Sequence, residues 1–149
     1  LTKLGNRFAM EKYINEIDAE KSIGVVYCDI TGLKRVNDSM GHEAGDQLIL
    51  RACDSLKKAF GEYGLFRIGG DEFSLIIEEG NINDEFCEMM VRRIKRVIDR
   101  PFNIEGRLLS VDTSCGYAIY PEHSQKIDEI RIMADHRMYE DKTQNRKKG

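Results

Sequence analysis

The sequence predicts an α+β domain in which a central, mainly antiparallel sheet is flanked by helices. Short apolar runs rich in β-branched and aromatic residues mix with helical patterns, without the strict β-α alternation of a doubly wound parallel sheet. Two of these runs are separated only by a short glycine-rich segment, as in an antiparallel hairpin. The length of 149 residues suits one domain with a core of its own.

The N-terminal half is expected to follow the order helix, strand, helix, helix. Asn6 can cap a first helix, and the apolar run over residues 23–30 predicts a buried strand. Residues 32–38 are polar and long enough for one or two helical turns. A long amphipathic helix then begins near Gly41 and ends at Gly61.

The C-terminal half is expected to add four strands and two helices. Residues 65–68 and 73–77 predict a hairpin, in which Gly69 and Gly70 would supply positive φ angles. A helix capped by Asn83 or Asp84 should follow and stop before Pro101. Strands are expected over 102–104 and 107–120, with turn signals at Glu105-Gly106 and Gly116. The last helix should begin near Ser124.

Composition argues against several classes of function. The net charge of −3 does not favour a nucleic-acid partner. Four scattered cysteines form no CxxC pair or Cys/His cluster, so we expect reduced core cysteines in the cytoplasm and no zinc site. The sequence offers no signal peptide and no apolar stretch near the ~18 residues of a membrane span, so this domain itself is not expected to contact a membrane. Because the chain opens close to a helix and ends in a basic tail, we expect residues 1–149 to be one domain of a longer protein, with or without a membrane anchor elsewhere.

Three acids stand where a fold alone would not favour them. Asp29 ends an apolar run, and Asp71 and Glu72 follow the two glycines of the hairpin. A buried, unpaired carboxylate is costly, so such groups usually coordinate a cation or meet a base. Together these acids could hold a hard divalent ion that bridges phosphate oxygens and activates a hydroxyl nucleophile. The alternative is that Asp29 pairs with a lysine and that the hairpin acids form an ordinary polar turn.

Candidate groups for a nucleotide lie outside any known phosphate loop, because neither GxxxxGK[ST] nor GxGxxG occurs. Lys34, and Lys142 with Arg146 on one face of the last helix, could meet phosphates, although a solvated helix end would look the same. A second polar group surrounds Gly41 and Gly45, and it comprises Asn37, Asp38, His42 and Asp46. Asp and Asn side chains suit the edge of guanine, whereas the alternative is helix capping, which explains Asp46 least well.

Five segments together resemble the GGDEF family, the diguanylate cyclases, over nearly the whole chain. They are Leu1-Thr2-x-Leu4-x-Asn6-Arg7, Asp29-Ile30-x-x-x-Lys34-x-x-Asn37-Asp38-x-x-Gly41-His42-x-x-Gly45-Asp46, Arg67-x-Gly69-Gly70-Asp71-Glu72-Phe73, Ser114-x-Gly116, and Ala134-Asp135-x-x-x-Tyr139-x-x-Lys142-x-x-x-Arg146. Each segment alone is a weak signal, but five in register are specific. The resemblance also implies the nucleotidyl cyclase or ferredoxin-like arrangement of the sheet.

The resemblance implies a role for each matching residue. Asp29, the carbonyl of Ile30 and Asp71 would hold Mg²⁺ or Mn²⁺. Asp71 or Glu72 would help to deprotonate a ribose 3′-hydroxyl. Asn37 and Asp46 would recognise guanine, with His42 nearby. Lys34, Lys142 and Arg146 would neutralise the triphosphate, and Lys34 is counted among the catalytic groups. Gly69 and Gly70 would let the nucleotide approach the backbone closely.

The resemblance further implies that two GTP molecules, one on each subunit of a homodimer, condense to cyclic di-GMP and two pyrophosphates. An upstream sensor or dimerisation domain would drive that pairing. Two alternatives remain open: a catalytically silent sensor that binds GTP or a cyclic dinucleotide, and another nucleotidyl cyclase or polymerase-like activity. The pair Asn37 and Asp46 argues against ATP, since Asp46 would face the acceptor N1 of adenine.

Three positions depart from the family pattern. Thr31 stands where a second acid is common, and Leu33 stands where phenylalanine is common, but neither is assigned to the metal or the base. Phe60 and Tyr63 occupy the positions of the Arg-x-x-Asp pair that binds inhibitory product in some members. We therefore expect that product-inhibition site to be absent here.

Overall fold

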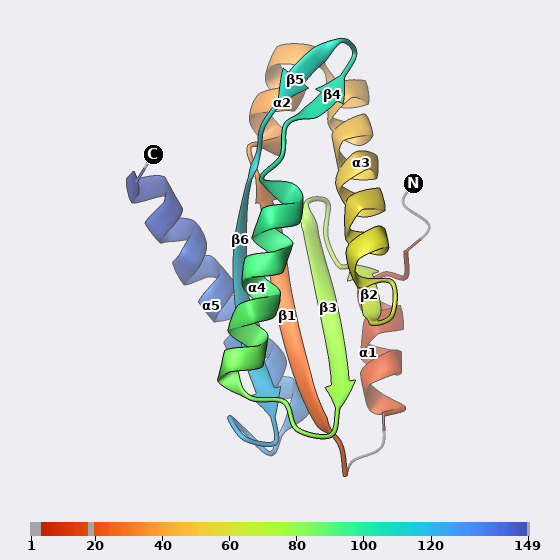
Figure 1. Cartoon of the computed structure of the whole chain (residues 1–149), viewed down its shortest axis with the longest axis vertical. Helices are drawn as coiled ribbons and strands as arrows, with labels where there is room; N and C mark the ends of the chain where they lie inside the picture. Colours follow the sequence, from red (N-terminus) through yellow and green to blue (C-terminus); the bar gives the residue numbers. More distant parts are fainter. Residues whose placement is uncertain (1–3, 18–19, 149) are drawn as a thin grey trace.

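The computed structural model describes residues 4–17 and 20–148, with side chains as far as Gln144. The elements are α1 (Arg7–Asn15), β1 (Ser22–Thr31), α2 (Leu33–Met40), α3 (His42–Phe60), β2 (Gly64–Arg67), β3 (Glu72–Glu79), α4 (Asp84–Ile98), β4 (Phe102–Ile104), β5 (Arg107–Leu109), β6 (Asp112–Tyr120) and α5 (Ile127–Lys148) (Figure 1). Leu1 and Thr2 of the opening motif lie outside the described residues.

The main sheet has the strand order β2-β3-β1-β6, and all three of its strand pairs are antiparallel. With α2 and α3 after β1, and α4 between β3 and β6, the connections are those of a ferredoxin-like βαββαβ fold. β4 and β5 form a separate two-stranded arm. The predicted α+β class and antiparallel sheet are confirmed.

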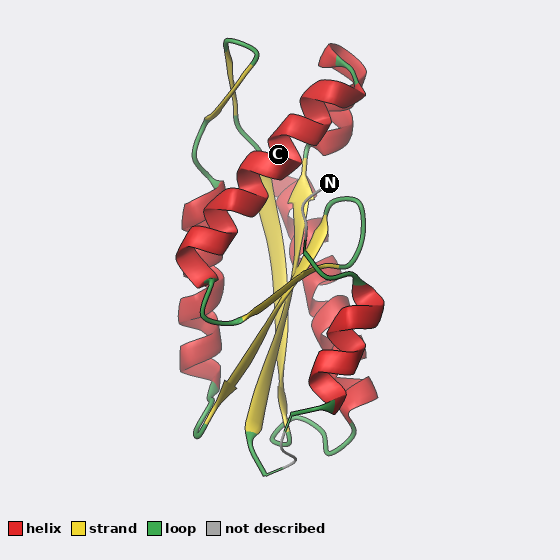
Figure 2. Cartoon of the chain, turned by 90° about the vertical axis from the view of Figure 1, so that its right-hand side faces the viewer, coloured by secondary structure: helices red, strands yellow, loops and turns green. Residues whose placement is uncertain are grey.

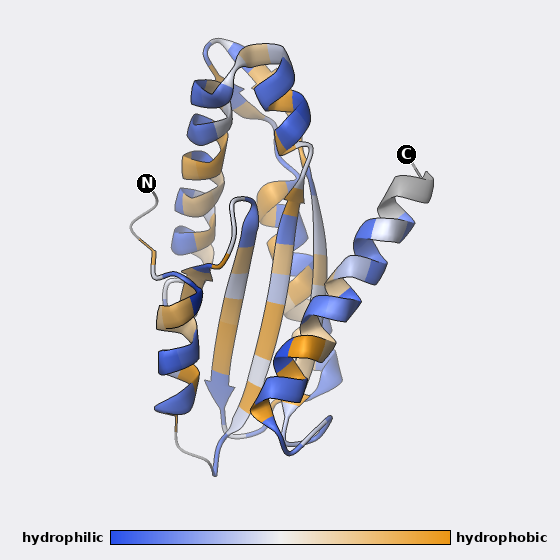
Figure 3. Cartoon of the chain, turned by 180° about the vertical axis from the view of Figure 1, so that it is seen from behind, coloured by the Kyte–Doolittle hydropathy of each residue, from blue (hydrophilic) through white to orange (hydrophobic). Residues whose placement is uncertain are grey.

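Helices cover both faces of the sheet (Figures 1 and 2). Alternate residues of β1 point to opposite faces, so Val26 and Cys28 join the core under α3 and α4. Val25 and Tyr27 join the second core under α1 and α5. Viewed from behind, α5 crosses over the sheet, whose strands carry long apolar stretches (Figure 3). Coverage of both faces explains why the β1 run is apolar throughout, except at Asp29.

Local capping agrees with the sequence prediction for two helices. The Asn6 side chain accepts a hydrogen bond from the Ala9 N–H at 3.0 Å, and Asn83 accepts one from Phe86 at 2.8 Å. Of the two candidate caps for α4, Asn83 is therefore the one used. The last helix begins at Ile127, three residues later than the expected Ser124, whose hydroxyl accepts a hydrogen bond from the Lys126 N–H.

Two expectations about glycines were wrong. Gly116 marks no turn but lies inside β6, and a Cβ there would meet the backbone of α5, at 2.1 Å from the Met138 nitrogen. Neither Gly69 nor Gly70 has a positive φ; the positive-φ glycines of the described residues are Gly32, Gly41 and Gly106. Residues 68–71 form a longer hairpin loop, which does not need the two positive φ angles of a two-residue turn.

All four cysteines are buried, and no disulfide forms among the described residues. None of the five helices in the described part of the chain combines the length and apolar character that a membrane crossing requires.

Candidate active site

Three carboxylates meet where β1 ends beside the β2–β3 hairpin. Asp29 lies opposite Glu72, the first residue of β3, in the antiparallel register. The Ile30 N–H donates to the carbonyl of Asp71 at 2.9 Å, which ties the hairpin loop to β1. Carboxylate oxygens of Asp29, Asp71 and Glu72 all lie within 4.8 Å of one another. The structure thus brings together the three acids that the sequence analysis selected.

The acid cluster favours protonated or cation-bound states. Burial, and then the charge of Asp29, raise the pKa of Asp71. The pKa of Glu72 is raised by burial first, and then by the charges of Asp29 and Asp71. Asp29 is only 3% exposed, and its Oδ1 atom has no hydrogen-bond partner among the described residues. An orphaned buried oxygen beside two further carboxylates is the donor chemistry that a hard divalent cation prefers.

A lysine partly balances this charge. Lys142 Nζ on α5 donates to Asp29 Oδ2 at 2.9 Å, and its side chain is about a quarter exposed. The alternative in which Asp29 pairs with a lysine is therefore part of the observed arrangement. That lysine is itself a predicted phosphate ligand, and one positive charge does not neutralise three carboxylates. The ion pair therefore leaves room for a further cation at the cluster.

A cleft of about 480 Å³ opens over these groups. It is lined by Asp29, Glu72, Ile132, Asp135, His136, Met138, Tyr139 and Lys142. α5 supplies most of this wall, yet only Lys142 and Arg146 were selected from that helix. Asp135 and Tyr139 belong to the last of the five motif segments but carry no predicted role, and the sequence analysis does not select His136. The spacing of Asp135 and Tyr139 from Lys142, seven and three residues, is the signal that places these two on one face, whereas no such signal marks His136.

Asn37 and Gly45 fit together between α2 and α3. A Cβ on Gly45 would lie 1.7 Å from Asn37 Oδ1, so the amide occupies the space that only glycine leaves. Asn37 Oδ1 is buried and has no hydrogen-bond partner within the part of the chain that the structure describes. Helix capping does not explain this group, because Gly32 and Gly41 occupy the N-cap positions of α2 and α3 and no side chain caps either helix.

Apart from the two basic residues of α5, the other predicted ligands of the nucleotide lie near the starts of the same two helices or on the hairpin. Lys34, His42 and Asp46 are exposed on α2 and α3. Gly70 is exposed, and no atom lies within 4 Å of where its Cβ would be, while a Cβ on Gly69 would be 3.3 Å from that of Glu72. Arg67 Nη2 donates to the Gly70 carbonyl at 2.6 Å and so braces the loop.

Arg146 lies within α5, but its side chain is outside the described residues. Whether it shares the face of Lys142 therefore stays a prediction.

At the two positions of the Arg-x-x-Asp pair, this chain has Phe60 and Tyr63, which cannot replace the guanidinium and the carboxylate of that pair. Phe60 is fully buried, and the Arg93 guanidinium lies over its ring at 4.9 Å. Tyr63 donates its hydroxyl to Glu79 at 3.5 Å. A core aromatic and a tyrosine thus stand where the pair would bind product.

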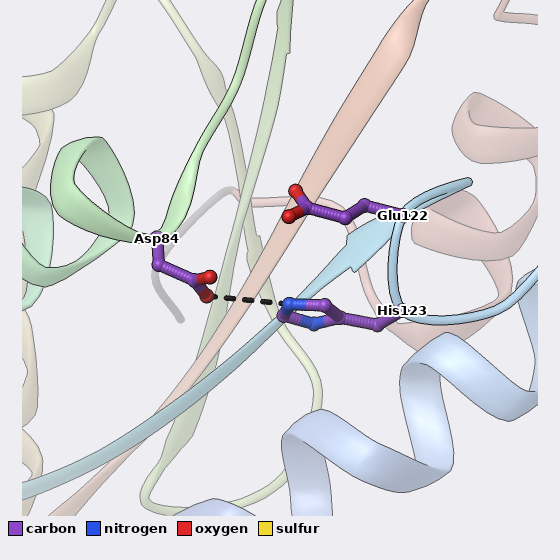
Figure 4. A group of neighbouring side chains, drawn as sticks. All are labelled: Asp84, Glu122 and His123. Carbon is purple, nitrogen blue, oxygen red and sulfur yellow. Dashed lines mark ion pairs between the residues drawn. The ribbon is translucent and has the colours of Figure 1, made fainter.

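A second group of ligand-type side chains, Asp84, Glu122 and His123, lies at the opposite end of β6 (Figure 4). His123 Nδ1 accepts the N–H of Ile119 at 3.1 Å, so the ring proton is on Nε2, which donates to Asp84 at 3.2 Å. A metal-bound histidine instead donates from its second ring nitrogen. This group therefore clamps the turn after β6 to the start of α4 and is not a metal site.

The pKa of Glu72 makes a prediction about stability. The folded state raises this pKa above its ordinary value of 4.5, so the folded chain binds the proton more tightly than the unfolded chain. Stability should therefore fall as pH rises through 4.5 towards the folded pKa, and the loss is complete above it. Without divalent metal, Glu72→Gln should raise the midpoint of thermal unfolding at pH 7, and the gain should shrink towards about pH 4.

Thermal melts across this pH range in EDTA test the prediction. Glu78→Gln, at an exposed glutamate further along β3, is the matched control and should show no such gain. A lower midpoint for Glu72→Gln at pH 7 would contradict the proposed repulsion. Added Mg²⁺ should stabilise the wild type more than Glu72→Gln.

A ferredoxin-like sheet with a carboxylate cluster at the end of its first strand places the molecule in the nucleotidyl-cyclase-like class of folds. The family model described as "Diguanylate cyclase, GGDEF domain" matches residues 1–148, and the chain belongs to this GGDEF family.

Relatives and solved structures agree with that assignment. The chain is 32% identical over 154 aligned positions to the bifunctional diguanylate cyclase/cyclic di-GMP phosphodiesterase MucR of Pseudomonas aeruginosa, covering 98% of this chain and 22% of MucR. It is 38% identical to the cyclic di-GMP phosphodiesterase PdeR of Escherichia coli, covering 93% of this chain and 21% of PdeR. A sensory box/GGDEF family protein of Caulobacter crescentus superposes with a TM-score of 0.86 at 26% identity, covering 96% of both chains. The chain thus spans about a fifth of the length of these two curated relatives.

Proposed function

We propose that this domain is a diguanylate cyclase that condenses two GTP molecules into cyclic di-GMP and releases two pyrophosphates. The observation that supports this best is the cluster of Asp29, Asp71 and Glu72, in which Asp29 pairs with Lys142 and Asp29, Glu72 and Lys142 line one cleft. Carboxylates for a cation and a lysine for phosphate are the groups that phosphoryl transfer needs. Membership of a family described as diguanylate cyclases supports the same activity.

Asp29, Asp71 and the Ile30 carbonyl would hold Mg²⁺ or Mn²⁺. The unpartnered Oδ1 of Asp29 and the raised pKa of Asp71 both fit a cation at this place. A bound ion of this kind supplies Lewis-acid polarisation of phosphate oxygens.

The proposed chemistry is an in-line displacement at phosphorus. The ribose 3′-oxygen of one GTP forms a bond to the α-phosphorus of the other, the bond to the β-phosphate bridge breaks, and pyrophosphate leaves. Asp71 or Glu72 accepts the hydroxyl proton, because a raised pKa makes a carboxylate a better proton acceptor. Repeating the step on the second pair of reacting groups closes the ring.

The other predicted residues bind and orient GTP. Lys34, Lys142 and Arg146 neutralise the triphosphate. Asp46 accepts from the guanine N1–H and N2–H, the Asn37 amide meets O6 or N3, and His42 lies nearby. Exposed Gly70 lets the nucleotide approach the hairpin backbone.

Each domain would hold one GTP, so catalysis requires two copies with facing clefts. We propose that an upstream sensor or dimerisation domain of a longer protein brings them together, consistent with the length of the curated relatives. GTP as substrate is consistent with a cytoplasmic location for this domain, whether or not the full protein is membrane-anchored.

The test is incubation of the domain, fused to a dimerising coiled coil, with GTP and Mg²⁺, followed by chromatography of the products. Cyclic di-GMP and pyrophosphate in a ratio of one to two support the proposal. Saturable GTP binding by the fused dimer without product would reject the cyclase and favour a catalytically silent sensor. The 38% identity to a relative named a phosphodiesterase is the observation that keeps this sensor as the second candidate.

Cyclic di-GMP itself is expected not to bind tightly at Phe60 and Tyr63. Calorimetric titration of the isolated domain should show no site with a Kd below about 1 µM, and any weaker binding should disappear in Asp46→Ala, which disables the proposed guanine site. Unaltered GTP binding in Phe60→Leu would confirm that this position is structural. A tight isotherm that survives the loss of Asp46 would contradict the absence of a product site.

A further inference from the structure

We propose that Asp141 is a positioning residue: it holds α5 at the position along β6 from which Lys142 reaches the cleft over the acid cluster. This inference rests on the proposed function, because Lys142 is its phosphate ligand. Asp141 Oδ2 accepts two hydrogen bonds of 2.8 Å, one from Lys95 Nζ on α4 and one from the backbone N–H of Cys115 on β6. One carboxylate oxygen therefore joins three elements.

The anchor lies beside the acid cluster in the sheet register. On β6, Ser114 is opposite Asp29 and Cys115 is opposite Cys28. Asp141 therefore bonds to β6 at Cys115, one residue from the position that faces Asp29. β6 is an edge strand of the four-stranded sheet. The Cys115 N–H is satisfied by Asp141, as an edge N–H needs a partner from outside the sheet.

Consecutive residues of a helix point about 100° apart, so Asp141 and Lys142 face different neighbours from the same turn. Asp141 faces a groove of about 410 Å³ between α4, β6 and α5, while Lys142 faces the cleft. The close packing of α5 on Gly116 sets how near the helix lies to β6, and the bonds of Asp141 to the Cys115 N–H and to Lys95 across the groove fix its position along the strand. A shift of α5 by one residue would move Lys142 by about 1.5 Å along the axis and turn it away from Asp29.

The bridge across the groove is a charged one. Burial lowers the pKa of Lys95, but the hydrogen bond and charge of Asp141 outweigh that effect, so the pKa is raised overall and the ammonium stays charged. Both side chains are between a quarter and a third exposed.

A double-mutant cycle separates positioning from ordinary stability. Calorimetry with a non-hydrolysable GTP analogue and Mg²⁺ gives Kd for the wild type, Asp141→Ala, Lys142→Ala and the double variant of the fused dimer. We expect Asp141→Ala to weaken binding roughly fivefold to tenfold, but to have no further effect once Lys142 is alanine. Equal losses in both backgrounds, or no loss in either, would overturn the proposal.

Two further variants sharpen the reading. Lys95→Met should reproduce part of the loss of affinity and Lys95→Arg should restore it, because arginine can still bridge the groove. Glu11→Ala, which breaks the 2.7 Å ion pair with Arg131 elsewhere on α5, is the matched control and should change thermal stability without changing Kd. A wild type that binds the analogue but forms no product rejects the cyclase alone, and the cycle still decides the role of Asp141. A wild type that binds no analogue rejects both.

Discussion

Replacing Asp71 and Glu72 together by alanine is expected to lower the rate of cyclic di-GMP formation by at least about a thousandfold. The variant loses the base candidate and two of the three carboxylates that lie within 4.8 Å of one another. Asp29 alone would then meet Lys142, and the pair would neutralise itself without a cation. Initial rates with GTP and Mg²⁺, measured on the fused dimer by chromatography of the product, give the comparison.

The fold should survive this double change. Burial and mutual repulsion raise the pKa of both acids, so their charges oppose folding at neutral pH and their removal should not lower the unfolding midpoint. Glu78→Ala with Glu79→Ala, two adjacent exposed acids at the far end of β3, is the matched control and should keep activity within about twofold. Product formed at the wild-type rate by the Asp71 and Glu72 variant would remove these residues from the active site.

The sheet and most helix ends could be predicted because their signals are local. Asn6 and Asn83 cap through hydrogen bonds to residues three positions away, and the apolar run of β1 reflects burial on both faces. The errors concern glycines whose roles depend on distant segments. Nothing near Gly116 in the sequence reveals that α5, about twenty residues later, packs against it, so the sequence alone predicts a turn there.

The residues of the candidate site also differ in whether a local sequence signal marks them or only the tertiary structure does. Asp29 could be selected because a carboxylate in an apolar run is costly, and the hairpin acids because they follow two glycines. That Lys142 bonds to Asp29, across 113 residues of sequence, depends on how α5 crosses the sheet. Asp135, His136 and Tyr139 were given no role because polar residues on a helix usually face solvent, and only the tertiary arrangement turns this face towards the cleft.

Gly116→Ala is expected to destabilise the fold by about 3 kcal/mol, which for this chain length corresponds to roughly 10 °C in the unfolding midpoint. The added Cβ would lie 2.1 Å from the Met138 nitrogen and 2.5 Å from the Ala134 carbonyl oxygen. Both are backbone atoms of α5, so no side-chain rotation can relieve the clash and the helix must move away from β6. Thermal and urea unfolding followed by circular dichroism measure the loss.

Function should fall with packing in this variant, because the same helix carries Lys142 and most of the cleft wall. A helix displaced from β6 would also stretch the Asp141 bond to the Cys115 N–H, so GTP affinity should drop even at temperatures where the variant remains folded. Gly80→Ala, at an exposed glycine with no atom within 4 Å of its Cβ position, is the matched control and should be neutral in both measurements. If Gly116→Ala unfolded like the wild type, α5 would not be held against β6 as described, and the placement of Lys142 over Asp29 would lose its structural basis.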